Sequence, residues 1–391
     1  MPPVNDCLPL SALILALLAL GLPAAGAEDD SVPPPLSAQM GAYKLEAARI
    51  FSPFWSSPTV YGETVFFVQD REGAPAEGTL LFRPGKVLAV RNALTGEGFE
   101  EGRDYTVDGA RRRLVLPKGS RIPFVHVSGL LKRKGEANGI AHKLGDPETW
   151  VLFGEDFFQG RQVAVDYERA EPWKGYVSRL ADKALPRTLG KLRRGEPLRI
   201  ALTGDSISAG ANATLWMSPQ GQPPFPQLFA AGLQAVYGSQ VELLNIAVGG
   251  WSTLDAMKNL DRILRFKPDL VLVGYGMNDV GYRDAARYSG NIQDIMQAVR
   301  AKAPEAEFIL LATSRSNPDW AATPIDQFAL YRDALARLCG EHVALADLTA
   351  LWSQMLERKR YHDLTGNGVN HPNDFGHRIY AQVLLGMLTK P

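Results

Sequence analysis

Short apolar runs separated by turn residues dominate the chain between residues 54 and 168. The runs are four or five residues long and are bounded by Gly, Pro or charged residues, which is typical of strands rather than helices. Asp108-Gly109 lies between two β-type stretches and is predicted to form a hairpin turn. Several short strands at near-regular spacing predict a β-sandwich of jelly-roll-like type. The runs are 64–68, 79–82, 87–90, 113–116, 124–127 and 163–167.

From Leu198 the pattern alternates between buried-strand runs and segments whose apolar residues recur at helical spacing. Alternating strands and helices with right-handed crossovers predict a parallel sheet covered by helices on both faces. We therefore expect a flavodoxin-like three-layer α/β/α domain with a five-stranded parallel sheet. Its strands are expected at 198–202, 241–248, 270–275, 308–312 and 343–348. Its helices are expected to carry Leu254, Met257, Leu260, Ile263 and Leu264; Ile292, Ile295, Met296 and Val299; Phe328, Tyr331, Leu335 and Leu338; and Ile379, Val383, Leu384 and Met387.

These patterns divide the chain into five segments. They are a signal peptide (1–27), a flexible lead-in (28–53), a β-sandwich accessory domain (54–168), a partly helical connector (169–196) and the α/β domain (197–391).

The first segment contains a nearly continuous apolar run from Leu8 to Leu22, followed by small residues up to Ala27. This order predicts a cleaved signal peptide and a secreted or periplasmic protein. Met1 to Cys7 contains no Lys or Arg, which is unusual for a signal peptide and leaves a misassigned start site or a membrane anchor as the alternatives. The run is shorter than the roughly 20 residues that a membrane span needs, so no span is expected after cleavage.

Composition narrows the range of partners. Acidic and basic residues balance at 42 each, so the chain has no overall field that would attract nucleic acid. Cys7 and Cys339 are the only cysteines, and signal cleavage would leave one. The mature protein is therefore expected to contain no internal disulfide and no cysteine-based metal site.

Candidate chemistry gathers where the strands of the α/β domain end. Ser206 follows the first strand of this domain, Gly250 the second and Asn278 the third. Loops at the carboxyl ends of parallel strands meet at one edge of the sheet, where α/β folds bind ligands. Glycine lets a backbone amide approach a substrate, and an asparagine carboxamide can donate to the same oxygen. His371, placed just before the last predicted helix, can reach this edge and act as a base near neutral pH.

Four blocks in a fixed order carry a resemblance to a known family. They are Gly204-Asp205-Ser206, residues 245–253, Gly276-Met277-Asn278-Asp279 and Asn370-His371-Pro372. Together they resemble the signature blocks of the SGNH (GDSL-type) hydrolases. The resemblance implies that Ser206 is the nucleophile and His371 the base. It also implies an oxyanion hole formed by the amides of Ser206 and Gly250 and by the Asn278 side chain, with no metal or organic cofactor. Asp205 and Asp279 are interpreted as structural, bonding nearby backbone amides.

The last block departs from the family pattern. The usual sequence is Asp-x-x-His, which would place the orienting acid at position 368, where this chain has Gly368. Three alternatives follow: Asp363 reaches His371 through a longer Gly-rich loop, a backbone carbonyl orients the imidazole, or Asp374 does so. The position of Asp374 in the first turn of the last helix is better explained by the helix dipole. We therefore favour Asp363.

The implied activity is that of a serine esterase. The predicted β-sandwich and the signal peptide resemble two-domain carbohydrate esterases of the family, which implies removal of small acyl groups, most simply acetyl, from a glycan. Aromatic residues in the loops at the sheet edge could stack on sugar rings or simply anchor those loops. Two other functions remain open: an O-acyltransferase with the same serine site, and a non-catalytic glycan-binding protein. These loops contain the aromatic residues Trp216, Trp251, Tyr282 and Trp320, and also Met217.

Overall fold

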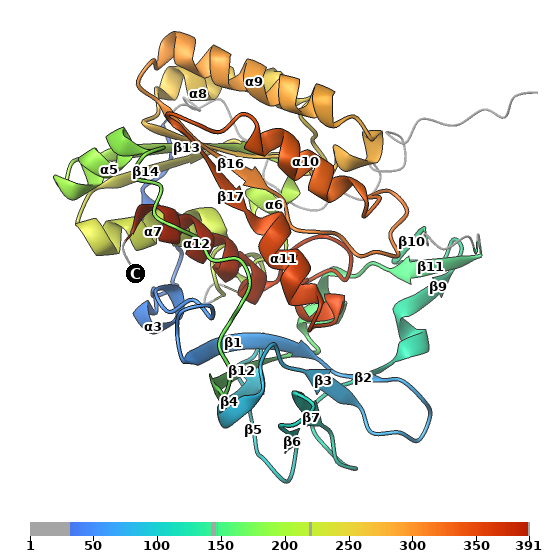
Figure 1. Ribbon diagram of the computed structural model, residues 1–391. Helices are drawn as coiled ribbons and strands as arrows, with labels where there is room; N and C mark the ends of the chain where they lie inside the picture. Colours follow the sequence, from blue (N-terminus) through green and yellow to red (C-terminus); the bar gives the residue numbers. More distant parts are fainter. Residues whose placement is uncertain (1–31, 142–145, 147, 219–220, 390–391) are drawn as a thin grey trace, which may run out of the picture.

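The computed structural model describes residues 32–141, 146, 148–218 and 221–389 (Figure 1). The predicted signal peptide, 1–27, therefore lies outside the described residues. Within the described ranges, none of the helices has both the length and the apolar character that crossing a bilayer requires.

A five-stranded parallel sheet forms the centre of the C-terminal half, with the order β14-β13-β15-β16-β17. Numbered along the chain, this is the order 2-1-3-4-5 of flavodoxin-like folds, so the predicted fold class is confirmed. The first strand, β13, lies between β14 and β15, which brings the carboxyl-end loops of these three strands together. The strands are β13 (Leu198–Gly204), β14 (Val241–Asn245), β15 (Leu270–Gly274), β16 (Glu307–Ala312) and β17 (Val343–Asp347).

Helices cover both faces of this sheet. In Figure 1, α7 and α12 lie between the sheet and the β-rich part of the molecule, whereas α8, α9 and α10 lie on the other face. Asn373 caps α12 as expected, since its side chain accepts a hydrogen bond from the amide of Gly376. The helices are α5 (Pro186–Arg193), α6 (Ser206–Ala209), α7 (Phe225–Tyr237), α8 (Asp261–Phe266), α9 (Ala285–Lys302), α10 (Gln327–Ala336), α11 (Leu348–Leu356) and α12 (Asp374–Leu388). Short 3₁₀ turns are η2 (Thr214–Trp216), η3 (Ala256–Lys258), η4 (Val280–Tyr282) and η5 (Tyr361–Asp363).

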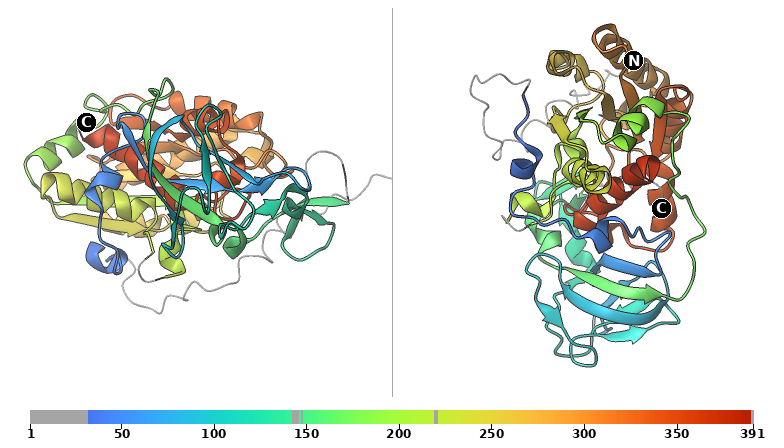
Figure 2. Two further views of the ribbon diagram at one scale, coloured as in Figure 1. Left: turned by 90° about the horizontal axis from the view of Figure 1, so that it is seen from below. Right: turned by 90° about the vertical axis from the view of Figure 1, so that its left-hand side faces the viewer.

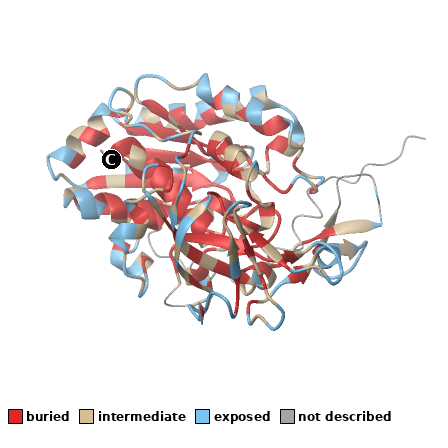
Figure 3. Ribbon diagram, turned by 60° about the horizontal axis from the view of Figure 1, so that its bottom comes forward, coloured by how far each residue is buried: buried red, intermediate tan, exposed pale blue. Residues whose placement is uncertain are grey.

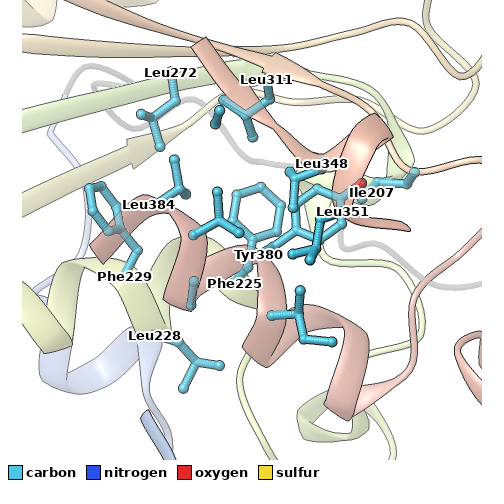
Figure 4. Close-up of a cluster of buried hydrophobic side chains, with 14 of the residues drawn as sticks. Ile207, Phe225, Leu228, Phe229, Leu272, Leu311, Leu348, Leu351, Tyr380 and Leu384 are labelled. Atoms are coloured by element: carbon cyan, nitrogen blue, oxygen red, sulfur yellow. The ribbon is translucent and has the colours of Figure 1, made fainter. Parts of the chain in front are cut away.

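A cluster of buried apolar side chains fixes the helices on the sheet (Figure 4). Leu272 and Leu311 come from the sheet, Phe225 and Phe229 from α7, and Leu384 from α12. Ile207, next in the chain to Ser206, belongs to the same cluster. The segment around the serine is therefore anchored directly in the core.

One predicted helix needs correction, and one helix was not predicted. The pattern from Leu254 to Leu264 forms no continuous helix, because the chain is interrupted between η3 and α8. Helix α7 escaped prediction, since its first turn contains Pro226 and follows the Pro-rich stretch 223–224. Proline is tolerated at this position because the first amides of a helix have no intrahelical partner.

The N-terminal half is β-rich, as predicted. A four-stranded sheet has the order β1-β12-β4-β5, and a five-stranded sheet has the order β6-β7-β3-β2-β8. The two sheets face each other (Figure 2), and a Cβ atom added to Gly78 in β3 would meet Val65 of β1 at 2.2 Å. The strands are β1 (Thr59–Phe66), β2 (Val68–Gln69), β3 (Glu77–Thr79), β4 (Pro84–Asn92), β5 (Gly98–Phe99), β6 (Thr106–Asp108), β7 (Arg113–Val115), β8 (Val125–His126) and β12 (Gln162–Arg169). A small third sheet contains β9 (Leu131–Arg133), β10 (Gly139–Ala141) and β11 (Thr149–Leu152); η1 (Val127–Leu130) precedes β9, and α4 (Glu155–Gln159) precedes β12.

The predicted hairpin at Asp108-Gly109 is confirmed, because β6 pairs antiparallel with β7. The strand expected at 79–82 is wrong beyond Thr79. The amide of Leu81 donates to the Glu63 carboxylate and that of Phe82 to the Tyr167 hydroxyl. Side chains take these backbone donors in place of a neighbouring strand.

The flexible lead-in at 28–53 stays a prediction, and its described part begins at residue 32. Residues 32–53 contain α2 (Leu36–Gln39) and α3 (Ala47–Ile50), with Leu36 and Ile50 buried. The segment is polar and Pro-rich overall, but a few of its apolar residues pack into the main hydrophobic core. The predicted domain boundaries at 168/169 and 196/197 stay predictions.

The β-rich part and the α/β domain share a buried polar contact. Lys359 lies after α11 and forms an ion pair with Glu63 of β1. Its ammonium group also donates to the carbonyls of Thr64, at 3.0 Å, and Thr79, at 2.7 Å. Both charged side chains are fully buried. Buried segments, red in Figure 3, run through both the α/β domain and the β-rich part. The ammonium group is thus held by three partners from the β-rich part.

Replacing Lys359 should therefore uncouple the two parts. We expect Lys359→Met to lower the free energy of unfolding by about 3–5 kcal/mol, because it leaves a buried carboxylate without its cation. Urea titration followed by circular dichroism measures this loss. Arg265→Met is the matched control: it breaks the exposed i,i+4 pair with Asp261 and should cost less than about 1 kcal/mol. Equal, small effects of the two substitutions would contradict the structural role of the buried pair.

Candidate active site

Ser206 lies where β13 ends and is the first residue of α6. The preceding Asp205 caps this short helix through a hydrogen bond from the Ile207 amide, at 3.0 Å. Gly204 leaves no room for a side chain, because a Cβ atom there would lie 2.4 Å from the Ser208 hydroxyl oxygen. The turn therefore places Ser206 at the carboxyl edge of the sheet, as predicted, and leaves it 6% exposed.

His371 reaches Ser206 from a loop 165 residues further along the chain. Its Nε2 lies 2.9 Å from the Ser206 Oγ, and its Nδ1 lies 2.9 Å from the Oδ1 of Asn212. Burial, followed by the proximity of His377, lowers the pKa of His371 to about 3. The imidazole is therefore neutral at neutral pH, with a lone pair available for the serine proton.

Asp363 does not take the role predicted for it. One of its carboxylate oxygens accepts from the Phe66 amide at 2.7 Å, and the other accepts from the Arg360 amide at 3.0 Å. Burial raises its pKa to about 6. The carboxylate thus joins the loop after α11 to β1, and it is Asn212 that contacts His371.

The other two alternatives are also answered by the geometry. Asp374 accepts from the amide of Thr214, at 2.9 Å, and from its hydroxyl, at 2.6 Å. No backbone carbonyl among the described residues hydrogen-bonds to the His371 ring. Asp374 instead stabilises the loop that carries Asn212.

Sequence reasoning missed Asn212. The residue follows the nucleophile block by only a few positions, but 159 residues separate it from His371. Its backbone has a φ of +62°, a left-handed conformation that asparagine tolerates better than most residues. A Gly-rich turn containing an asparagine was the only available signal, and it does not point to a partner.

The loops after β14 and β15 are tied to each other beside Ser206. The Asn278 carboxamide donates to the Trp251 carbonyl at 2.8 Å. Asp279 accepts from the amide of Thr253 at 2.9 Å and from its hydroxyl at 2.5 Å. Gly250, with a φ of +77°, lies in a turn of the loop after β14. Asp205 and Asp279 thus bond backbone amides, as interpreted from the sequence.

The β-rich part reaches the loop of His371. A Cβ atom at Gly368 would lie 2.3 Å from the ring of Phe158 in α4, so only glycine fits there. Gln162 of β12 donates to the carbonyls of His362, at 2.8 Å, and Thr365, at 2.7 Å. At position 368 the family pattern has its acid, but here Gly368 packs directly against Phe158 of the β-rich part.

Comparison with known proteins agrees with this geometry. Residues 202–379 match the model of the GDSL-like Lipase/Acylhydrolase family. This domain belongs to that family. It is a carboxylic-ester hydrolase domain of the SGNH type, and Ser206, Gly250, Asn278 and His371 all lie within the matched region. No curated protein matches the chain.

Three solved structures resemble the SGNH domain. A variant of Axe2, an acetyl-xylooligosaccharide esterase from Geobacillus stearothermophilus, is 18% identical, with 51% of this chain and 97% of that chain covered and a TM-score of 0.43. A two-domain esterase active on acetylated mannans is also 18% identical, with 55% of each chain covered and a TM-score of 0.42. Phospholipase A1 from Streptomyces albidoflavus is 19% identical, with 49% and 99% covered and a TM-score of 0.38. At these values the likenesses carry no argument about the substrate.

The buried carboxylate of Asp279 makes the stability of the SGNH domain depend on pH. Burial raises its pKa from 3.8 to about 6, so the folded state binds more protons than the unfolded state between these values. The unfolding free energy of the wild type should fall as pH rises through this window. Asp279→Asn keeps the acceptor for Thr253 but cannot ionise. The variant should therefore gain about 3 kcal/mol relative to the wild type between pH 4 and 7.

Urea unfolding of both proteins across this range measures the difference. A difference that stays constant with pH would show that Asp279 titrates normally in the folded protein.

Proposed function

We propose that the protein is a secreted or periplasmic serine esterase that removes small acyl groups, most simply acetyl, from a carbohydrate. The observation that carries the proposal is the hydrogen bond between the Ser206 Oγ and the His371 Nε2, at 2.9 Å. A nucleophile, a neutral base and nearby amide donors are the groups that acyl transfer requires.

In the proposed reaction, the Ser206 Oγ attacks the acyl carbonyl carbon while His371 Nε2 takes the hydroxyl proton. The amides of Ser206 and Gly250 and the Asn278 side chain donate to the oxyanion that forms. Collapse of this intermediate breaks the ester bond, and His371 returns the proton to the leaving sugar hydroxyl. Water then attacks the acyl-enzyme with His371 again as base, which releases the carboxylic acid and restores Ser206.

The surroundings of Ser206 favour a small acyl group. Neither Ser206 nor His371 lines any of the three most prominent cavities of the described part of the chain. The largest of these, about 900 Å³, is lined by residues such as Tyr176, Val343 and Met387 and contains none of the site blocks. None of these three cavities therefore holds a long acyl chain at the serine, which supports a small acyl group.

Exposed aromatic residues favour a carbohydrate. The Trp216 side chain is 60% exposed, and its indole nitrogen donates to the carbonyl of Gly210, the residue that ends α6. An exposed indole next to the nucleophile helix offers a flat apolar face to a sugar ring. Tyr282, 56% exposed, follows Asn278 and offers a second face. Trp320 is buried and is not a candidate. Export itself rests on the apolar run from Leu8 to Leu22.

Turnover of 4-nitrophenyl esters of increasing chain length tests the proposal. We expect hydrolysis of the acetate, rates that fall from butyrate onward, and loss of at least about 10⁴-fold in kcat for Ser206→Ala. Acetylated glycans would then be screened for release of acetate. No turnover by the wild type, or turnover that survives in Ser206→Ala, would contradict a serine esterase, and equal rates with long chains would contradict the small acyl group.

The donor role of Asn278 is tested separately. Asn278→Ala should lower kcat by about 10²–10³-fold with little change in KM, because the lost hydrogen bond acts mainly on the transition state. Asn291→Ala is a suitable control, since that side chain donates to the Thr253 hydroxyl, in the same region. A loss in KM alone would assign Asn278 to substrate binding instead.

A further inference from the structure

The imidazole of His371 is held by an amide rather than by a carboxylate. Its Nδ1 meets the Asn212 Oδ1 at 2.9 Å, and its Nε2 meets the Ser206 Oγ at the same distance. An amide oxygen can only accept, so this arrangement requires the proton on Nδ1 and leaves the Nε2 lone pair facing the serine. The two contacts together select the tautomer that a general base needs.

We propose that Asn212 is the positioning residue of this site, taking the place of the acid in a Ser-His-Asp triad. The inference rests on the proposed function and deepens it, because it names the group that makes His371 competent. Asn212 touches neither the reacting atoms nor the substrate; it acts through the imidazole.

The neighbouring carboxylates are committed elsewhere. Both oxygens of Asp363 accept from backbone amides, and both oxygens of Asp374 accept from Thr214. Asp205, next to the nucleophile, accepts from the Ile207 amide. Among the described residues, no carboxylate hydrogen-bonds to His371. Asn212 is thus the side chain that holds the Nδ1 edge of the ring.

The loop around Asn212 is fixed on every side. His377 of α12 contacts the carbonyl of Ala211 through Nε2 at 3.0 Å, and Asp374 holds Thr214. Gln159, from the β-rich part, donates to the carbonyl of Asn212 itself at 2.6 Å. A Cβ atom at Gly366 would lie 2.8 Å from the Asn212 Cβ, so glycine is required where the two loops meet. A loop built only to connect two helices would not need these contacts from three separate segments.

A neutral partner has a consequence for pH dependence. A carboxylate beside an imidazole stabilises the imidazolium and raises its pKa, whereas an amide provides no such charge. The titratable groups packed around His371 are His377, which is neutral and buried, and Asp374 and Asp205, which bond to backbone groups as described. The acid limb of kcat/KM should therefore lie below the ordinary histidine value of about 6.5.

Removing the amide tests the proposal. We expect Asn212→Gly to lower kcat by about 10²-fold or more with KM nearly unchanged, because the imidazole loses its preferred tautomer and orientation. Glycine accepts the left-handed backbone, so strain does not complicate the result. Asn138→Gly is the matched control: Asn138 also has a positive φ, +59°, and is exposed. Both variants should keep the melting temperature of the wild type within a few degrees.

Replacing the amide by a carboxylate gives the second test. Asn212→Asp should remain active at pH 8, while the acid limb of kcat/KM moves upward by at least one pH unit. The ¹⁵N NMR shifts of the His371 ring report the tautomer without turnover: the proton should lie on Nδ1 in the wild type and shift toward Nε2 in Asn212→Gly.

Three results would overturn the proposal. They are Asn212→Gly activity within twofold of the wild type, an unchanged acid limb in Asn212→Asp, and a wild-type His371 protonated on Nε2. Loss of turnover in the wild type itself would instead contradict the proposed function, and the NMR measurement would still decide the position of the proton.

Discussion

The segment from Lys359 to Asn373 is packed between the α/β domain and the β-rich part, and the geometry of His371 depends on this burial. The segment has few backbone partners of its own, because it is neither helix nor sheet over most of its length. The Asn367 side chain accepts from three of the segment's amides. Gln162 and the amide of Phe66, from the other side of the interface, bond the carbonyls of His362 and Thr365 and the Asp363 carboxylate. Buried polar groups without partners are costly, so these contacts favour one arrangement of the loop. The β-rich part thus forms the wall against which His371 is set.

This packing also explains which charges the site uses. Asp363 and Asp374 both lie within eight residues of His371. Each carboxylate accepts hydrogen bonds from backbone amides and so holds a loop in place. Burial of an imidazole next to another ionised group would require further compensation. A site with a neutral histidine and a neutral amide avoids that cost, and its base stays unprotonated well below neutral pH. Desolvation thus has two effects here: the carboxylates bond backbone amides, and the site around Ser206 stays neutral.

The elements predicted best were those with strong local patterns. The five strands of the parallel sheet, the hairpin at Asp108-Gly109 and the cap at Asn373 followed from period, turn chemistry and capping preference. The docked helices of 32–53 and helix α7 did not, because their apolar residues are few or mixed with proline. Ser206 and His371 could be placed from ordered blocks, whereas Asn212 could not. Its partner is chosen by how two distant loops meet at Gly366, which is a property of the packed molecule rather than of any local stretch.

The central claim is that Ser206 is a nucleophile activated by His371 in the folded protein. Labelling with a fluorophosphonate ester, followed by peptide mass spectrometry, tests this most directly because it needs no knowledge of the substrate. We expect a single adduct on Ser206 of the native protein, formed much more slowly in His371→Ala and absent after unfolding in urea. No adduct, an adduct on another serine, or labelling at the same rate without His371 would contradict it.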